Sequence, residues 1–240
     1  MLNIFSGLHK FFKRTKRTVN TGRNNKIILI KNGQEYPYHD EINGLVIHIL
    51  GNNNKVILHY PIKAMNSFIF IASDNSLVDI GTSICLANLN IDCNNGTHQQ
   101  CIIGPNTTVY GMTIKLCEKA VVNIGADCMF SNYINIWASD GHSIIDIKTG
   151  KILNHSDTPV IIGNHVWIGE GVKISKKTHI HDNCIVGMGA ICTKDYKKTN
   201  VIIAGNPAKI IRENVNWDKM NPYHLQNQRN AQQSFKLHKS

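Results

Sequence analysis

The chain has 240 residues, of which 42% are hydrophobic and 18% are charged, and its formal net charge is +10. These values are typical of a folded protein with a sizeable core and exclude a disordered chain. Seven bases and no acids fall in residues 1–26, so the remaining chain is close to neutral. A basic arm on a near-neutral body does not indicate a nucleic-acid-binding protein.

The seven cysteines form an odd set without a CxxC pair, so the sequence indicates neither a disulfide framework nor a zinc knuckle. Small apolar side chains packed in a reducing compartment are the expected role. We therefore expect a cytoplasmic protein.

Residues 1–26 place apolar side chains on one helical face before a basic run. The segment lacks the long apolar stretch and the cleavage site of a secretory signal. It predicts a helix that caps the core, and peripheral contact with the inner face of an anionic membrane is the alternative. The apolar residues are Leu2, Phe5, Leu8, Phe11 and Phe12.

Between residues 27 and 137, short apolar runs alternate with stretches rich in Asn and Gly, such as 51–58 and 91–97, which supply turns. Large apolar residues recur here at a spacing of six, with interruptions. The recurring sets are Ile71 with Leu77, Ile103 with Val109, and Ile124 with Phe130 and Ile136, and the last set is accompanied by Cys128 and Ile134.

Residues 138–160 break this spacing completely, although repeats lie on both sides. An insertion between repeats has to leave the stacked core as an excursion loop. Long loops in compact repeat folds are usually functional.

From residue 162 to residue 192 the spacing of six is unbroken. Alternate side chains of a strand face one way, so the first and fifth residues of each hexad point inward and the sixth, such as Trp167, points outward. A turn residue after each short strand bends the chain, and three bends close a triangular coil of about eighteen residues. The first column is Ile162, Ile168, Ile174, Ile180, Val186 and Cys192, and the fifth is Val166, Val172, Thr178, Cys184 and Ala190.

The sequence therefore predicts an all-β parallel β-helix over residues 27–212. Residues 213–240 form a polar, Gln-rich tail that is expected to contain a short helix or a partly ordered end.

The hexads ending in "GMGAICTKD" and "IIAGNPAKIIRE" resemble those of the hexapeptide-repeat acyltransferases. "SDGHSIIDIKTGKI" followed by "VIIGNHVWIGEGVKI" is most similar to bacterial O-acetyltransferases of capsule and lipopolysaccharide sugars, including those acting on sialic acid and polysialic acid. The resemblance covers residues 100–218. It implies a left-handed β-helix, acetyl-CoA as co-substrate, a sugar hydroxyl as acceptor, and a homotrimer with active sites between subunits.

Acetyl transfer to a hydroxyl requires a base near neutral pH and support for an oxyanion. His142 lies in the excursion loop between Asp140 and Asp146, either of which can fix its tautomer, and the resemblance makes it the catalytic base. A polar turn is the structural alternative for this stretch. Weaker candidates for the base are His155, His165, His179 and His181.

Two outward tryptophans are candidate site residues. The resemblance places Trp167 beside the base and the acetyl-CoA thioester, whereas burial against a neighbouring subunit is the alternative. Trp137 and His165 are expected to border the acceptor, and packing in a subunit interface is the equal alternative for Trp137. The expected CoA-binding residues, partly from the resemblance and partly because lysine and arginine pair with phosphates, are Trp167, Gly187, Gly189, Thr193, Lys194, Lys209 and Arg212.

No nucleophile elbow is visible, so we expect direct transfer without an acetyl-enzyme and without a metal. An N-acetyltransferase acting on a nucleotide-linked amino sugar is the nearest alternative. A zinc lyase of the γ-carbonic anhydrase type is a weaker one, because three converging ligands cannot be identified around "HIH" at 179–181. A non-catalytic β-helix scaffold is the third.

Overall fold

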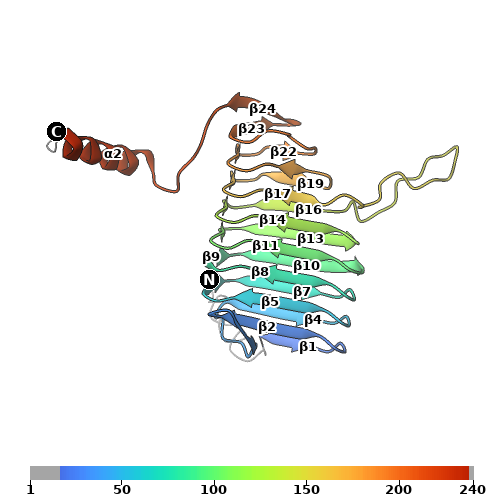
Figure 1. Cartoon of the computed structure of the whole chain (residues 1–240). Coiled ribbons are helices and arrows are strands. Elements are labelled where there is room, and N and C mark those ends of the chain that lie inside the picture. The colour runs from blue at the N-terminus through green and yellow to red at the C-terminus, as the bar shows by residue number, and fades with distance from the viewer. Residues whose placement is uncertain (1–16, 238–240) are drawn as a thin grey trace, which may run out of the picture.

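The computed structural model describes residues 17–237, and in them the chain winds into a three-sided prism of stacked coils (Figure 1). Each side is an eight-stranded sheet in which strands from successive coils pair in parallel. Only β3 and β24 run antiparallel to their neighbours among the described strands. The predicted parallel β-helix is confirmed.

We call the three sides sheets A, B and C. Sheet A contains β1 (Thr18–Asn20), β4 (Leu45–Ile49), β7 (Ser67–Ile71), β10 (Leu89–Gly96), β13 (Met112–Glu118), β16 (Ile134–Trp137), β19 (Lys173–Ser175) and β22 (Ile191–Cys192). Sheet B contains β3 (Gln34–Pro37), β2 (Lys26–Lys31), β5 (Lys55–His59), β8 (Leu77–Ile80), β11 (Gln100–Ile103), β14 (Val121–Ile124), β17 (Val160–Ile162) and β20 (His179–Ile180). Sheet C contains β6 (Ile62–Met65), β9 (Ser83–Ala87), β12 (Thr108–Val109), β15 (Met129–Phe130), β18 (Trp167–Ile168), β21 (Ile185–Val186), β23 (Val201–Gly205) and β24 (Ala208–Glu213).

The inward columns of the hexads form the core. All eleven residues of the two columns from Ile162 to Cys192 are at most 1% exposed, and partners such as Ile162 and Ile180 stack in adjacent coils. Side chains at every second strand position thus bury their apolar surface between coils, which is the main stabilising term of the fold. Upstream, Ile103 with Val109 and the set from Ile124 to Ile136 are buried as predicted.

The pair Ile71 and Leu77 was predicted wrongly, because Leu77 is only partly buried and Val78 takes the inward position instead. The reason is a longer coil. Ile69 pairs with Ile91, 22 residues further on, whereas Ile162 pairs with Ile180 after 18 residues. The extra corner residues shift the inward column away from a strict spacing of six.

Asparagines make many of the corners. Most non-glycine residues with a positive φ are asparagines, among them Asn24, Asn53 and Asn75, and asparagine tolerates this left-handed conformation better than most residues. The nearby Asn54 is 1% exposed, and it donates to the Ser73 carbonyl at 2.8 Å and accepts from the Ser76 amide at 2.7 Å. The Asn-rich stretches are therefore structured turns, as predicted.

The first coil begins earlier than the expected boundary at residue 27. Strand β1 lies within the 1–26 segment and pairs with β4, because Thr18 stands opposite Ile47. The part of the predicted amphipathic cap or membrane arm that spans residues 1–16 lies outside the described residues.

Two segments leave the prism (Figure 1). Residues 138–160 depart between β16 and β17, at the corner that joins sheets A and B, and form the predicted excursion loop. On the opposite side in this view, α2 (Pro222–Leu237) projects away from the prism. Among the described residues, no helix has the length and apolar character needed to cross a membrane.

Close stacking at the glycine corners gives a stability prediction. A Cβ at Gly125 would lie 2.6 Å from the carbonyl carbon and oxygen of Gly163, which are backbone atoms of the next coil. At Gly111 the nearest atom would be the Tyr133 nitrogen at 3.3 Å. We expect Gly125→Ala to destabilise the fold by about 1–3 kcal/mol and to lower Tm by several degrees, and Gly111→Ala to have a smaller effect. Equal melting temperatures of both variants in calorimetry would contradict this account.

Candidate active site

The excursion loop is a hairpin fastened at its base. Its two arms meet at an isolated antiparallel bridge between Ile145 and Ile152. Asn154, which is 9% exposed, donates through Nδ2 to Asp140 Oδ2 at 2.7 Å and to the His142 carbonyl at 2.8 Å, and it accepts from the Ile144 amide at 2.8 Å. One buried amide side chain thus fixes both arms of the loop around His142.

Lys176, from the coil above, completes this fastening. Its Nζ lies 2.5 Å from Asp140 Oδ2 and donates to the Asn154 carbonyl at 2.6 Å. The hydrogen bond from Lys176, followed by that from Asn154, lowers the pKa of Asp140. The carboxylate is therefore ionised near neutral pH and ties the loop to the prism.

The imidazole of His142 is exposed and lines a cavity of about 250 Å³ under the loop, with Glu118, Asn154 and His155 among the other residues. Neither predicted aspartate is bonded to this ring in the described structure. Asp140 binds Lys176 and Asn154, while Asp146 accepts hydrogen bonds from Thr149 and the Lys148 amide and shapes the tip of the hairpin.

Glu118 is a carboxylate that the sequence reasoning missed. It ends β13, accepts a hydrogen bond from Ser139 Oγ at 2.6 Å and one from the Ser156 amide at 3.2 Å, and lies 3.6 Å from His155 Nδ1. The bond from Ser139 is the largest cause that lowers the pKa of Glu118. Glu118 also lines a neighbouring cavity of about 460 Å³, so it separates two hollows beside the loop. No motif marks it in the sequence.

Trp167 points outward from sheet C, as predicted, and is 39% exposed. The indole of Trp217 lies 6.1 Å away between ring centroids. Trp217 belongs to residues 214–220, which we call the C-terminal strap, and it is only 8% exposed. The strap therefore covers part of the surface beside Trp167.

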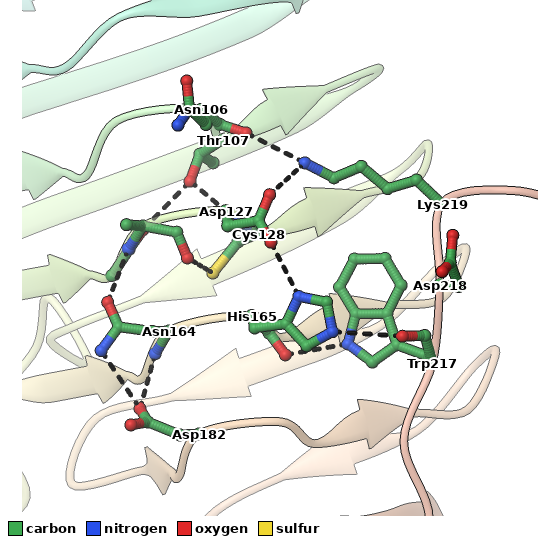
Figure 2. A network of polar contacts seen from close by, with 12 residues as sticks. Asn106, Thr107, Asp127, Cys128, Asn164, His165, Asp182, Trp217, Asp218 and Lys219 are labelled. Atoms are coloured by element: carbon green, nitrogen blue, oxygen red, sulfur yellow. Dashed lines mark hydrogen bonds and ion pairs between the residues drawn. The ribbon is translucent and has the colours of Figure 1, made fainter.

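His165 holds this strap in place (Figure 2). Its ring stacks on Trp217 with centroids 4.3 Å apart, its Nε2 lies 3.2 Å from the Trp217 carbonyl oxygen, and its own carbonyl accepts from Trp217 Nε1 at 2.8 Å. Its Nδ1 lies 2.8 Å from Asp127. Both ring nitrogens of His165 are therefore occupied by the protein itself.

Lys219 is the second fastening of the strap, at 2.5 Å from Asp127 Oδ1 (Figure 2). Burial alone would raise the pKa of Asp127, but the hydrogen bonds from Lys219 and His165 outweigh it and lower that pKa. Asp127 is thus an ionised anchor shared by two side chains.

The remaining predicted residues fall into two groups on opposite sides of the prism. Thr193 and Lys194 follow β22 at the corner between sheets A and B, from which the His142 loop also departs. Trp137 is 48% exposed at the end of β16 on sheet A, over a hollow of about 410 Å³. The members on sheet C or directly after its strands are Trp167, Gly187, Gly189, Lys209 and Arg212.

The strap gives a prediction that can be measured by proteolysis. Trp217→Ala removes a buried indole that stacks on His165, so the strap should detach from the prism more often and leave the backbone at Lys219 free to enter a protease. We expect tryptic cleavage after Lys219 to become at least about tenfold faster, since cleavage follows the population of the open form. Tyr223→Ala, which removes a ring that is 71% exposed, is the matched control. Cleavage at the wild-type rate in Trp217→Ala would contradict this role.

Comparison with known proteins agrees with the geometry. The family model described as bacterial transferase hexapeptide (six repeats) matches residues 159–194. A polysialic acid O-acetyltransferase of Neisseria meningitidis is 35% identical over 179 residues, which cover 74% of this chain and 81% of that protein.

Two crystal structures are similar over most of the chain. The polySia-specific acetyltransferase NeuO has a TM-score of 0.72 and 29% identity, with 85% of this chain and 89% of that chain covered. The polysialic acid O-acetyltransferase OatWY has a TM-score of 0.66 and 28% identity, with 85% and 92% covered. The likeness confirms the expected left-handed β-helix. Its stacked hexads and its sequence identity of 35% with the Neisseria enzyme show that the chain belongs to the hexapeptide-repeat O-acetyltransferases.

Proposed function

We propose that this protein transfers the acetyl group of acetyl-CoA to a hydroxyl of a bacterial surface glycan that contains sialic acid. The observation that carries the proposal is the 35% identity with a polysialic acid O-acetyltransferase across 81% of that enzyme. Membership of the family favours acetyl transfer over the lyase and the non-catalytic scaffold.

His142 is the proposed general base. Its imidazole accepts the proton of the sugar hydroxyl while the hydroxyl oxygen attacks the thioester carbonyl, and a tetrahedral oxyanion forms. Collapse of this intermediate breaks the carbon–sulfur bond, and the CoA thiolate takes the proton back from the imidazolium. The exposed position of His142 on the rim of a cavity supports this role, because both substrates can reach the ring.

Asp140 and Asn154 act as positioning residues in this proposal. Their hydrogen bonds hold the His142 backbone at the neck of the hairpin, and Lys176 ties both to the prism. A base held by its backbone needs little reorganisation when the substrates arrive. Asp146 shapes the hairpin tip, so its contribution is indirect.

The active site is proposed to form between two subunits of a homotrimer. Within one chain, the His142 loop leaves the corner between sheets A and B, whereas Trp167 faces out from sheet C on the other side of the prism. A cyclic trimer places one such corner against the neighbour's sheet C at three equivalent interfaces. Large apolar side chains of the loop support this contact, since they are exposed in the single chain. They are Ile144, Ile145, Ile147, Ile152 and Leu153.

In this arrangement Lys194, Lys209 and Arg212 bind the phosphates of CoA, and Trp167 lies beside its thioester. Lys209 and Arg212 are exposed on β24, in the same sheet as Trp167, where they are available to the phosphates. Lys194 and Thr193 approach from the adjacent subunit's corner, and Gly187 and Gly189 leave room for the pantetheine arm. Trp137 borders the acceptor above its hollow on sheet A. His165 acts on this site only through the strap, because its ring nitrogens are engaged.

Removal of the proposed base gives the first test. His142→Ala should lower kcat at least about a hundredfold, since general base catalysis contributes this much, while the affinity for acetyl-CoA stays near the wild-type value. His39→Ala, which changes an exposed histidine at the other end of the prism, is the matched control. Wild-type turnover by His142→Ala on a sialylated acceptor would reject the assignment.

A mixing experiment tests the shared site. In each mixed trimer of His142→Ala and Trp167→Ala chains, one interface joins an intact loop to an intact indole. Co-expression in equal amounts should therefore restore about a quarter of the wild-type activity, although each variant alone is strongly impaired. Mixing His142→Ala with a chain that carries both His142→Ala and Trp167→Ala should restore no activity, because no chain then has an intact loop histidine. No recovery in the first mixture would show that the site lies within one chain.

The chemistry of the product separates oxygen from nitrogen acetylation. Mild alkali hydrolyses the proposed O-acetyl ester and releases acetate, whereas an N-acetyl amide on an amino sugar is stable under these conditions. We expect alkali-labile acetate on sialylated glycans in a screen that also contains neutral and uronic-acid glycans. An alkali-stable product would replace this proposal with the N-acetyltransferase alternative.

A further inference from the structure

The upper end of sheet B carries three potential metal ligands that acetyl transfer does not use. His179 lies on β20, His181 follows two residues later, and Asp195 lies in the next coil, where it forms an isolated parallel bridge with His179. The two histidines point to the same side because alternate residues of a strand share a face. Stacking of coils then brings the carboxylate to them from 14 residues away.

The ligand atoms of these three side chains converge. His181 Nε2 lies 2.9 Å and His179 Nδ1 lies 3.9 Å from the same oxygen, Asp195 Oδ1, and all three ligand atoms are within 4.8 Å of one another. Around a tetrahedral zinc ion with bonds of about 2.1 Å, ligand atoms are about 3.4 Å apart. The observed separations lie on either side of this value, so small side-chain rotations are enough to admit the ion.

The arrangement is held by a ring stack and a backbone hydrogen bond, yet it is open to solvent. The imidazole rings stack with centroids 3.7 Å apart, and the Lys197 amide donates to Asp195 Oδ1 at 2.9 Å and fixes the carboxylate. The three side chains are 32%, 28% and 41% exposed, respectively, so an ion can reach them. A second layer of hydrogen bonds that orients the ligands is a usual feature of metal sites.

We propose that His179, His181 and Asp195 bind one divalent transition-metal ion of the zinc type, with solvent completing the coordination. Two imidazoles and one carboxylate are the ligand set that zinc, nickel and cobalt accept, whereas magnesium and calcium prefer oxygen ligands alone. The ion would tie the loop after β22 to β20 and so close the upper end of the prism. The His181–Asp195 hydrogen bond spans the same gap.

The motif "HIH" supplies only two ligands, so the sequence did not reveal the third one, Asp195. His59 and Asp79 form a comparable pair at 3.0 Å lower on sheet B, but no third ligand joins them among the described residues. This pair offers an internal control, because it has the same histidine–carboxylate geometry without the second imidazole.

The experiment uses tag-free, full-length protein that has been stripped with EDTA and dialysed. Calorimetric titration with zinc chloride should give about one ion per chain with a Kd below about 10 µM, and cobalt chloride should produce visible absorption bands of a low-coordinate site. His181→Ala and Asp195→Asn should weaken binding at least about a hundredfold, and His59→Ala should bind as the wild type does. None of these readouts depends on acetyl transfer.

Thermal unfolding provides the second measurement. An ion that binds only the folded chain should raise Tm by about 5 °C when its concentration is 100-fold above Kd, and this shift should disappear in His181→Ala but persist in His59→Ala. The proposal is overturned if the wild type binds no zinc or cobalt at 100 µM, or if His181→Ala and His59→Ala bind equally. The cobalt spectrum of the wild type decides the matter even if a variant fails to fold.

Discussion

The structure depends on the parallel stacking of buried aliphatic side chains between coils. Each strand pairs with the strand one coil below and one coil above, so an inward residue such as Ile168 rests on Phe130 beneath it and supports Val186 above it. Because every layer needs the same register, corners have to be compact, and glycine or left-handed asparagine meets this demand. Extra residues are accommodated as longer corners or register shifts in the 22-residue coils, and as a loop that leaves the prism in 138–160.

This constraint explains where the proposed active site lies. The walls of the prism are regular, and their outward side chains alternate with the core, so a wall alone offers a flat surface. The excursion loop projects from one corner, and hydrogen bonds among Asn154, Asp140 and Lys176 hold it in place. The strap adds a second element beside Trp167 through His165 and Asp127. Both elements are long-range additions to the same repetitive body.

The proposed function and the proposed metal site use different side chains of this body. Acetyl transfer is assigned to the loop corner of one subunit and sheet C of another. The metal site lies on the outer face of sheet B, where His179, His181 and Asp195 come together across one coil. Asp195 directly follows the proposed CoA-contacting residues Thr193 and Lys194, but zinc and cobalt binding are measured without acetyl transfer, so each proposal has its own test.

The sequence by itself determined the repeat, the inward columns, the excursion and the outward face of Trp167. These features are local, because a spacing of six and alternation along a strand can be read within one coil. It predicted the upstream coils less well, since coils of 22 residues displaced Leu77 from the column. His142 could be identified as a candidate base only because the surrounding residues resemble the family motif.

Only the tertiary structure decided which distant residues meet. Stacking brings together residues one coil apart or more, and the sequence does not state how long each intervening coil is. For this reason Glu118 beside the loop, Trp217 on His165, and Asp195 beside the two histidines were not predicted. The partners of Asp140 were misjudged for the same reason, because Lys176 lies one coil further along the chain and reaches it only when the coils stack.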